Sequence, residues 1–425
     1  EIIYMKDLQE KSGVKMEVIR HGKYKSAVEP FLAQEMSPEN REQMTVLLNS
    51  VWNTIVADIS KSRKLSVAQL NAIANTLGAR TPELALANKL VDKVAYEDEY
   101  HDMIRAKLKV DKKEKYDIVS ITDYAKKASS TVEDYSKDDI IAVIYAQGEI
   151  AGGEGDVNVI GEGSIKRSLQ EARDDKDVKA IVLRVNSPGG SALTSELIWR
   201  EIEITKKVKP VVVSMGNYAA SGGYYIAANA DRIFAEPNTI TGSIGVFGML
   251  PNMNQLGKNI GINAEQVKTH ENASGYSVFE PMDENFKGFV LESIEKTYAT
   301  FLKRVADGRK MTTEQVDAIA QGRVWTGVDA HKLGLVDEIG GLDAAIKYAA
   351  KLGKTSSYRT ENYPEYEKNF EDLLANFTGM AMFKTKEQLL KEQLGEEGFQ
   401  MLEQIKRVKS RKGIQAIMPY EIVIN

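Results

Sequence analysis

Several kinds of residue are scarce in this chain of 425 residues. It has no cysteine, which excludes disulfides and thiol chemistry, and it has only four histidines. Its apolar stretches are broken well short of the roughly 18 residues that a membrane-spanning helix needs. A net charge of −5 leaves no basic excess, so nucleic acid is not expected as a partner.

The rest of the composition is that of a globular protein. Hydrophobic residues make up 43% of the chain and charged residues 28%, which is enough to bury a sizeable core in two to three domains. Short β-branched runs precede several helical stretches, which suits an α/β fold with a parallel sheet.

Ser221 lies in the most informative stretch, residues 218–225 (YAASGGYY). The preceding run 210–215 suits a buried parallel strand, and residues 224–230 continue as a helix would. At such a junction the hydroxyl stands clear of bulky side chains, and the first helical amides point toward an oxyanion formed beside it. Ser221 is therefore a candidate nucleophile, although a glycine-rich packing turn is the simpler explanation of Ala-Ser-Gly-Gly alone.

A second glycine turn follows another apolar run, residues 180–185. It contains Gly189 and Gly190 and precedes a helical stretch over 192–207. Adjacent glycines leave their backbone amides unshielded by side chains. Parallel strands end at one edge of a sheet, where such folds bind ligands, so Gly189 or Gly190 is expected to supply one oxyanion donor and Gly222 the other. By itself, a Pro-Gly-Gly turn indicates little.

A serine hydroxyl needs a base to accept its proton. His101 and His331 fall in charged helical stretches, whereas His21 and His270 lie near strand ends without an acidic partner in a motif. A Ser-His-Asp triad stays open on this reasoning. The other candidate base is a lysine whose pKa burial lowers from about 10.4 toward neutrality.

The chain also contains an internal duplication. Residues 52–74 align without gaps on residues 298–320, with identities that include Arg63 with Arg309. Three further pairs of segments match in the same order: 8–14 with 256–262, 29–30 with 280–281, and 90–92 with 335–337. The offset stays between about 245 and 251, so it places the start of the first copy about 110 residues before Glu1. We therefore expect the first repeat to be incomplete in this chain.

The two copies differ in one lysine. Lys25 belongs to residues 21–31 of the first copy, and the matching residues 273–281 of the second copy contain no lysine. Tyrosine, alanine, valine and phenylalanine flank Lys25 closely enough to desolvate its ammonium group. A solvated loop lysine is the ordinary interpretation of any one such residue.

Several motifs in order carry a resemblance to a known family. They are residues 24–31 (YKSAVEPF), 183–191 (LRVNSPGGS), 219–224 (AASGGY), 241–246 (TGSIGV) and 322–327 (GRVWTG). Together they resemble the long form of the signal peptide peptidase A family, also called protease IV, from about residue 4 to about residue 350. The resemblance implies a Ser-Lys dyad with Ser221 as nucleophile and Lys25 as general base. It also implies a tandem-repeated fold similar to the Clp protease subunit and the crotonases.

The same resemblance implies a biological setting. Family members have an amino-terminal anchor in the bacterial inner membrane and a catalytic domain in the periplasm, and they assemble as homotetramers. They hydrolyse signal peptides after these are released from their precursors. The anchor is not visible in these residues.

The expected organisation has four parts. Residues 1–108 are the end of the first repeat, which carries the lysine, and residues 138–353 are the second repeat, which carries the serine. Between them, residues 109–137 form a linker with an edge strand at 116–121. Residues 354–425 form a helical extension with an amphipathic helix at 384–409.

The predicted mechanism needs neither metal nor organic cofactor. Neutral Lys25 accepts the proton of Ser221, which attacks a peptide carbonyl, and Ser243 is a weaker candidate for orienting the lysine. The loop at 148–163 is expected to lie along an extended substrate. Two alternatives remain: a crotonase-like enzyme that acts on acyl-thioesters, and a non-catalytic scaffold of the cell envelope.

Overall fold

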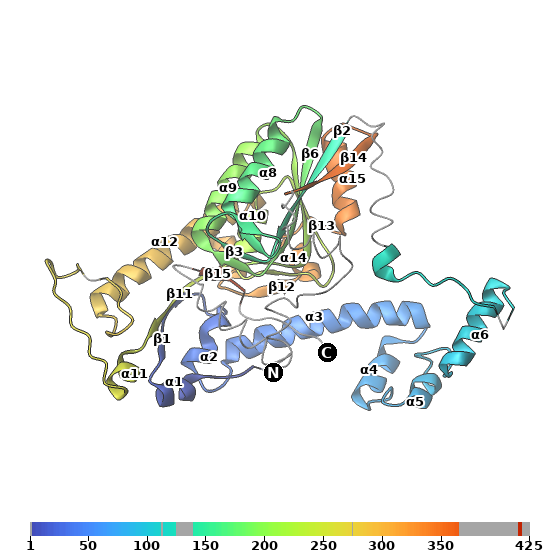
Figure 1. Cartoon of the computed structure of the whole chain (residues 1–425), viewed down its shortest axis with the longest axis horizontal. Helices are drawn as coiled ribbons and strands as arrows, with labels where there is room; N and C mark the ends of the chain where they lie inside the picture. Colours follow the sequence, from blue (N-terminus) through green and yellow to red (C-terminus); the bar gives the residue numbers. More distant parts are fainter. Residues whose placement is uncertain (1, 112–113, 125–138, 274, 365–414, 419–425) are drawn as a thin grey trace, which may run out of the picture. The chain divides into compact units, whose positions relative to one another are not determined.

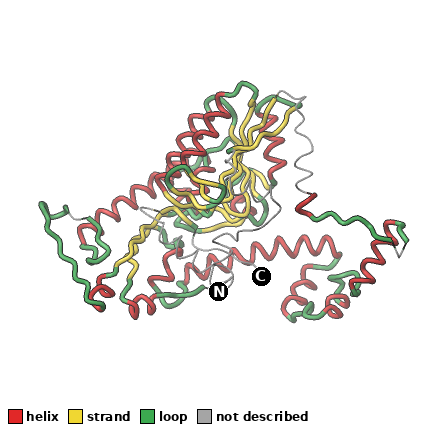
Figure 2. Tube along the Cα trace, viewed as in Figure 1, coloured by secondary structure: helices red, strands yellow, loops and turns green. Residues whose placement is uncertain are grey.

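The computed structural model describes residues 2–111, 114–124, 139–273, 275–364 and 415–418 (Figure 1). They form two compact units, one made of Glu1–Leu47 with Asp138–Asn425 and the other of Leu48–Lys137. Figure 2 distinguishes their helices from their strands. The first unit contains every residue for which a catalytic role is predicted.

The strands of the first unit are β1 (Lys15–His21), β2 (Asp139–Gln147), β3 (Glu149–Ala151), β4 (Gly155–Asp156), β5 (Val159–Gly161), β6 (Val178–Ser187), β7 (Gly189–Ser191), β8 (Val211–Ala220), β9 (Arg232–Ala235), β10 (Ile240–Gly242), β11 (Val246–Asn252), β12 (Val324–Thr326), β13 (Glu338–Ile339), β14 (Tyr358–Tyr363) and β15 (Gln415–Ile417). Its helices are α1 (Lys6–Ser12), α2 (Glu29–Leu32), the first part of α3 (Pro38–Arg63), α8 (Glu162–Asp174), α9 (Ala192–Lys206), α10 (Gly222–Ala227), α11 (Asn254–Asn259), α12 (Glu284–Arg309), α13 (Thr313–Ile319), α14 (Gly327–Lys332) and α15 (Leu342–Leu352).

The main sheet has the strand order β12-β10-β8-β6-β2-β14, with β9 beside β8 and β13 beside β9. Its neighbouring strands run parallel, except that β12 is antiparallel to β10. The runs predicted as strands at 180–185 and 210–215 lie within β6 and β8. The α/β fold with a parallel sheet and flanking helices is therefore confirmed.

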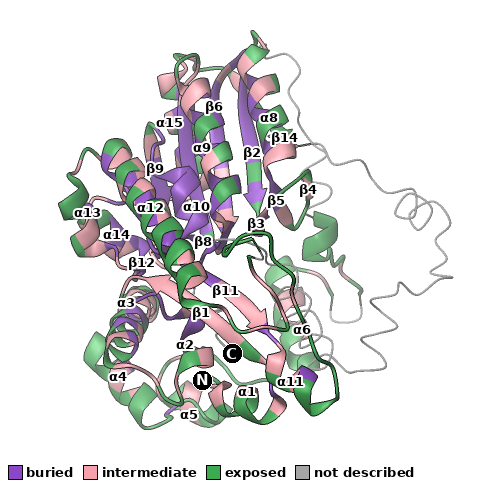
Figure 3. Ribbon diagram, turned by 90° about the vertical axis from the view of Figure 1, so that its left-hand side faces the viewer, coloured by how far each residue is buried: buried purple, intermediate pink, exposed green. Residues whose placement is uncertain are grey.

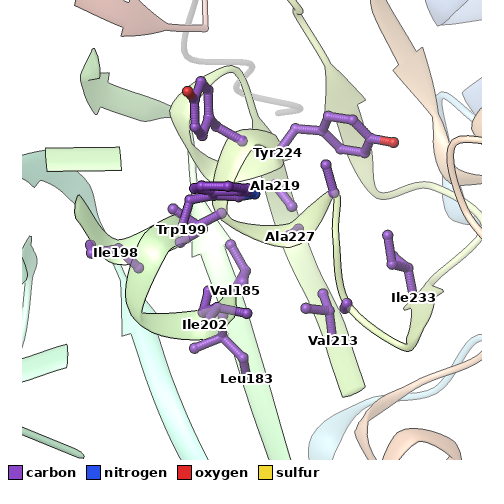
Figure 4. Close-up of a cluster of buried hydrophobic side chains, with 14 of the residues drawn as sticks. Leu183, Val185, Ile198, Trp199, Ile202, Val213, Ala219, Tyr224, Ala227 and Ile233 are labelled. Atoms are coloured by element: carbon purple, nitrogen blue, oxygen red, sulfur yellow. The ribbon is translucent and has the colours of Figure 1, made fainter. Parts of the chain in front are cut away.

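Helices cover both faces of this sheet, and side chains on successive strand residues point to opposite faces. On β2 and β6, Ile141 and Val182 pack with α15, whereas Ile144 and Leu183 pack toward α8, α9 and α10. Figure 3 shows the resulting band of buried strand residues, and Figure 4 shows the side chains of the second layer. Burying one such aliphatic side chain contributes about 1.5–3 kcal/mol, so this double layer makes β6 and β8 a rigid base for the turns at their ends.

A second sheet has the order β1-β11-β15-β7-β3-β5-β4. Its strand β7 continues from β6 through the Pro188 turn, and β1 and β11 form an antiparallel ribbon. The prediction of a loop at 148–163 is wrong, because these residues form β3, β4 and β5. Ile150 of β3 pairs with Gly190, so β3 covers one edge of β7.

The duplication is visible in matching elements. Helices α3 and α12 have the same length of 26 residues, and each is followed by a short helix that begins with a Ser/Thr–Gln capping box. An arginine at the end of each long helix forms a bidentate pair with a later aspartate, Arg63 with Asp92 and Arg309 with Asp337. These pairs occupy the positions that the sequence alignment equates.

The smaller unit contains the rest of α3 and the helices α4 (Val67–Asn75), α5 (Pro82–Ala87) and α6 (Glu97–Leu108). Val56, Leu65 and Leu70 form its buried cluster. The edge strand predicted at 116–121 is wrong: residues 116–120 have no strand conformation, and Ile118 is exposed because no described strand pairs with it.

The sequence predicts a helical extension at residues 354–425, of which the structure describes 354–364 and 415–418. These residues contain two strands, β14 at the edge of the main sheet and β15 between β11 and β7. The helix predicted at 384–409 lies outside the described residues. None of the described helices combines the length and apolar character that crossing a bilayer requires.

Candidate active site

Ser221 lies between the end of β8 and the start of α10, as the sequence predicts. Its backbone has φ 56° and ψ −116°, a conformation that costs a non-glycine residue about 1–3 kcal/mol. Two hydrogen bonds hold it there: its N–H donates to the carbonyl of Gly242 at 2.8 Å, and its carbonyl accepts from the N–H of Tyr225 at 2.8 Å. The strained turn thereby fixes the direction of the serine hydroxyl.

The two glycines after Ser221 allow α10 to approach the β6–β7 turn closely. A Cβ at Gly222 would lie 2.7 Å from Ser195 Oγ, and one at Gly223 would lie 2.7 Å from the carbonyl oxygen of Ser187. The glycine pair therefore serves packing, and it also brings the start of the helix next to the second glycine turn.

The side chain of Lys25 is completely buried, and its amino group meets Ser221. Lys25 Nζ lies 2.9 Å from Ser221 Oγ, 3.0 Å from Ser243 Oγ and 3.2 Å from the carbonyl oxygen of Ser243. Burial lowers the pKa of Lys25 well below its ordinary value, which favours the neutral amine. The structure thus brings together the three side chains that the sequence singles out.

Two glycines make room for the lysine. Gly322 has φ 81°, and a Cβ there would lie 2.6 Å from Lys25 Cβ, while a Cβ at Gly245 would lie 3.2 Å from Lys25 Cδ. The methylene groups of Lys25 therefore pack directly against the backbone of these two glycines, and this packing excludes water from the side chain.

Ser243 also has a left-handed backbone, with φ 51°, and its N–H donates to the carbonyl of Arg323 at 2.7 Å. A neutral amine has two N–H groups and one lone pair. In the neutral form, N–H groups that donate to the hydroxyl and carbonyl oxygens of Ser243 would leave the lone pair of Lys25 directed at Ser221 Oγ. The geometry is suited to moving a proton from the serine to the lysine.

The backbone on both sides of Lys25 is held by groups that the sequence analysis missed. Gln43, which is buried on α3, donates from Nε2 to the carbonyl of Tyr24 at 3.1 Å and to Ser26 Oγ at 2.8 Å. Arg20 donates to the carbonyl of Lys25 at 3.1 Å. No local pattern marks Gln43, since a single polar residue on a helix is ordinarily exposed.

The predicted oxyanion donors converge beside Ser221. Gly189 has φ 103°, and a Cβ there would lie 2.8 Å from the amide nitrogen of Gly222. The N–H of Gly189 donates to Ser187 Oγ at 3.2 Å, and Gly190 is paired with Ala416 of β15. The glycine turns thus meet at one end of the site, with backbone amides of both in close proximity.

The four histidines make their described contacts elsewhere. Nδ1 of His21 lies 2.7 Å from a Glu295 carboxylate oxygen, and Nδ1 of His331 lies 3.2 Å from the carbonyl oxygen of Val336. His101 contacts a tyrosine hydroxyl and His270 a threonine hydroxyl. Among the described contacts of Ser221 Oγ, the basic partner is Lys25.

Comparison with known proteins adds a family and curated relatives. Residues 1–111 and 203–356 match peptidase family S49, which is more than half of the chain. Protease 4 of Haemophilus influenzae is 39% identical over 364 residues, which cover 83% of this chain and 58% of that protein. Serine protease SPPA, chloroplastic, of Arabidopsis thaliana is 35% identical over 345 residues, which cover 80% of this chain and 51% of that protein. The chain thus spans between half and three-fifths of the length of these relatives.

Among solved structures, a ClpP1 mutant from Listeria monocytogenes aligns with 48% of this chain and 94% of its own. The TM-score is 0.33 and the sequence identity is 16%.

Proposed function

Because this chain belongs to peptidase family S49, we propose that it is a serine endopeptidase in which Ser221 is the nucleophile and Lys25 the general base. The observation that carries the proposal is the 2.9 Å contact between Lys25 Nζ and Ser221 Oγ in a completely buried setting. Among the described residues, Lys25 Nζ has hydroxyl and carbonyl partners and no carboxylate. Such a buried lysine costs stability, so its placement against a strained serine favours a catalytic role over a structural one.

In the proposed reaction, the lone pair of Lys25 accepts the proton of the Ser221 hydroxyl as its oxygen bonds to a peptide carbonyl carbon. Ser243 orients the amine through its hydroxyl and carbonyl oxygens. The resulting ammonium then gives its proton to the nitrogen of the departing amine as the peptide bond breaks. Water, deprotonated by the same lysine, hydrolyses the acyl-enzyme and restores the serine.

The tetrahedral intermediate carries a negative oxygen that needs backbone donors. The amide of Gly222 opens helix α10 beside Ser221, and the amide of Gly190 lies 3.2 Å from where a Cβ of Gly222 would be. The N–H of Gly189 serves as a donor only if it leaves Ser187 Oγ. Donors of this kind each contribute about 2.7–4 kcal/mol to transition-state stabilisation when they are held in place beforehand. The interlocked glycine contacts support such rigidity.

The proposed substrates are peptides with small and apolar side chains, cleaved signal peptides among them. We also propose that the enzyme works in the bacterial cell envelope, on the periplasmic side of the inner membrane, as a homotetramer. These three points rest on the family resemblance.

A labelling experiment tests the dyad. The full chain, Ser221→Ala, Lys25→Met and the control Lys166→Met, at an exposed lysine of α8, are treated with a serine-directed acylating probe at several pH values. We expect labelling of Ser221 that rises with pH, through a midpoint below the ordinary lysine pKa, in the native chain and the control. Lys25→Met should label at least about a hundredfold more slowly, since general-base catalysis contributes about 10²–10⁴. Undiminished labelling of Lys25→Met refutes Lys25 as base.

Substrate assays separate the alternatives. Cleavage of apolar peptides that is lost in Ser221→Ala supports the endopeptidase. Hydrolysis of a coenzyme A thioester with no action on peptides favours a crotonase-like enzyme instead. A scaffold predicts neither activity and no selective labelling of Ser221.

A further inference from the structure

A short stretch of backbone links the turn of the proposed base to the turn of the serine that orients it. The carbonyl of Gln321 accepts a hydrogen bond at 2.9 Å from the N–H of Tyr24, the residue before the base. Further along the same stretch, the carbonyl of Arg323 accepts from the N–H of Ser243 at 2.7 Å. We call residues 321–323 the bridge segment, since their backbone sets the distance between the two turns.

The bridge segment reaches both members of the proposed dyad. A Cβ at Gly322 would lie 2.6 Å from Lys25 Cβ, so the lysine packs directly on the bridge segment. On the other side, the turn of Ser243 includes Gly242, whose carbonyl accepts from the N–H of Ser221 at 2.8 Å. The 2.9 Å contact between Lys25 Nζ and Ser221 Oγ therefore depends on where the bridge segment lies.

One buried phenol fixes the first residue of the bridge segment. Tyr298 of α12 is 4% exposed, and its hydroxyl accepts from the backbone N–H and from Nε2 of Gln321, both at 3.3 Å. The same hydroxyl donates to Asp317 Oδ1 at 2.5 Å. Gln321 has φ 54°, a left-handed conformation that is costly for a residue other than glycine. The phenol thus holds a strained residue in place.

The first copy contains a similar pair of residues that lacks this function. Trp52 has the position of Tyr298 in the alignment of the two copies. Its Nε1 donates at 2.7 Å to Oδ1 of Asn71, which has the position of Asp317. Both pairs therefore join the long helix to the short helix that follows it. An indole N–H donates and does not accept, so Trp52 has no means of binding a backbone N–H as the phenol does.

The short helices also end differently in the two copies. In the alignment, α4 and α13 begin at equivalent residues, Val67 and Thr313. Helix α4 continues to Asn75, whereas α13 ends at Ile319, before the residue equivalent to Asn75, which is Gln321. The N–H of Gln321 therefore lies outside the helix, and the phenol supplies its acceptor. The second copy departs from the first at the residues that form the bridge segment.

We infer that Tyr298 is a positioning residue for the proposed base: its hydroxyl fixes the bridge segment, and thereby the placement of Lys25 against Ser221. This inference rests on the proposed function. Among the described hydrogen bonds, those of the Tyr298 hydroxyl go to Asp317 and Gln321, so it acts on the dyad through the bridge segment. A misplacement of about 1 Å in a catalytic group costs about a hundredfold in rate.

An activity assay with a matched control tests the inference. Tyr298→Phe removes the hydroxyl and keeps the ring, which stacks on His21 with ring centroids 3.9 Å apart. The control is Tyr363→Phe on β14, at the opposite edge of the main sheet from β12. There the hydroxyl of Tyr363 likewise donates to a carboxylate, at 2.7 Å from Glu361 Oε1.

Tyr298→Phe should lower kcat for peptide cleavage about tenfold with KM unchanged, since a loosened segment moves the base by less than 1 Å. The control Tyr363→Phe should keep the native kcat and KM. Each variant loses one hydrogen bond, so both should lose similar stability in urea unfolding. A purely structural role of Tyr298 would give the two variants the same kcat, and that result refutes the inference.

Amide hydrogen exchange tests the same inference without catalysis. It is measured at single amides in Ser221→Ala, alone and combined with Tyr298→Phe or Tyr363→Phe. The Tyr298→Phe change should speed exchange at Tyr24 and Ser243 about tenfold or more, because both amides donate to the bridge segment. The Tyr363→Phe change should leave both rates as they are. Equal rates in all three proteins overturn the inference.

The bond between Tyr298 and Asp317 provides a rescue test. Asp317→Ala removes the oxygen that orients the phenol, whereas Asp317→Asn keeps an oxygen acceptor, as Asn71 does for Trp52 in the first copy. We expect kcat to fall in Asp317→Ala and to be about threefold or more higher in Asp317→Asn. Equal kcat values in these two variants contradict the inference.

The inference and the proposed function fail in different ways. Peptide hydrolysis that survives Ser221→Ala refutes the dyad, whatever the exchange rates are. Hydrolysis that is lost in Ser221→Ala and unchanged in Tyr298→Phe refutes the positioning role and leaves the dyad intact. If both hold, Tyr298→Phe lowers kcat and the rate at which the acylating probe labels Ser221 by the same factor.

Discussion

The burial of Lys25 makes a sharp prediction about stability. Burial lowers the pKa of Lys25 in the folded protein, whereas in the unfolded chain it returns to about 10.4. Between these two values the unfolded chain binds one proton more than the folded chain. Stability therefore rises with pH across this window, by about 1.4 kcal/mol per pH unit from this residue alone. Above about 10.4 the contribution is zero, and below it the buried amine is a cost.

Replacing the lysine by methionine removes that cost. Methionine has a similar length and three rotatable bonds, so it can follow the same path along Gly322 and Gly245 without carrying a charge. We expect Lys25→Met to be inactive and more stable than the native chain at pH 7. Its advantage should shrink by about 1.4 kcal/mol for each unit that the pH is raised within the window.

Urea unfolding at pH 6.5, 7.5 and 8.5 measures the effect. Each protein carries Trp52→Phe, so that the fluorescence comes from Trp199 and Trp325 of the first unit. Lys166→Met serves as the control, since an exposed lysine has no such burial cost. The free energy of unfolding of the control should differ from that of the native chain by the same amount at all three pH values. If the difference in free energy of unfolding between Lys25→Met and the native chain is also constant across the three pH values, Lys25 is charged in the folded protein. The reasoning about the base is then refuted.

Two further predictions concern Ser243 and the duplicated arginine. Ser243→Ala removes one oxygen that orients Lys25 Nζ, so kcat for peptide cleavage should fall about fivefold, equivalent to about 1 kcal/mol, with KM unchanged. The hydroxyl oxygen of Ser243 also stabilises the charged form of Lys25, so its loss should lower the pKa of Lys25 further. The acid limb of the pH profile of kcat/KM should then move to lower pH, and a shift to higher pH contradicts the assignment. Arg309→Met breaks a bidentate pair whose arginine side chain is 7% exposed and should destabilise the first unit by about 3–5 kcal/mol in urea unfolding. The equivalent Arg63→Met, at a pair with an exposed aspartate, should cost at most about 1 kcal/mol, and equal losses would show that burial does not set the difference.

The parts of the structure that were predictable are those with a local signal. The β-branched runs that became β6 and β8 are long enough for their composition to identify them, and their glycine-rich ends mark the turns. Ser221 was found from this pattern. Lys25 was found only through the comparison of the two repeats and the family resemblance, because a lysine in a turn has no distinctive local signal.

Other parts depend on pairing between distant segments. Strands β3 and β15 have three residues each, too few to show a period, and they are strands because β7 presents both of its edges to them. Gln43 is buried because the turn around Lys25 offers it a carbonyl and a hydroxyl. The run at 116–121 shows the reverse. Its composition favours a strand, but residues 116–120 have no regular secondary structure and no described strand pairs with them.

The site also explains why neither repeat suffices for the proposed chemistry. Lys25 comes from the first copy, but the groups that surround its amine and its methylene chain belong to the second: Ser221, Ser243, Gly245 and Gly322. In an unfolded or partly folded chain this lysine is an ordinary ammonium and cannot accept a proton. Lys25 becomes a base only when residues of the second copy bury its amine. The fold that positions Ser221 is therefore also the fold that activates Ser221. A chain that has not folded is thereby prevented from cleaving itself or its neighbours.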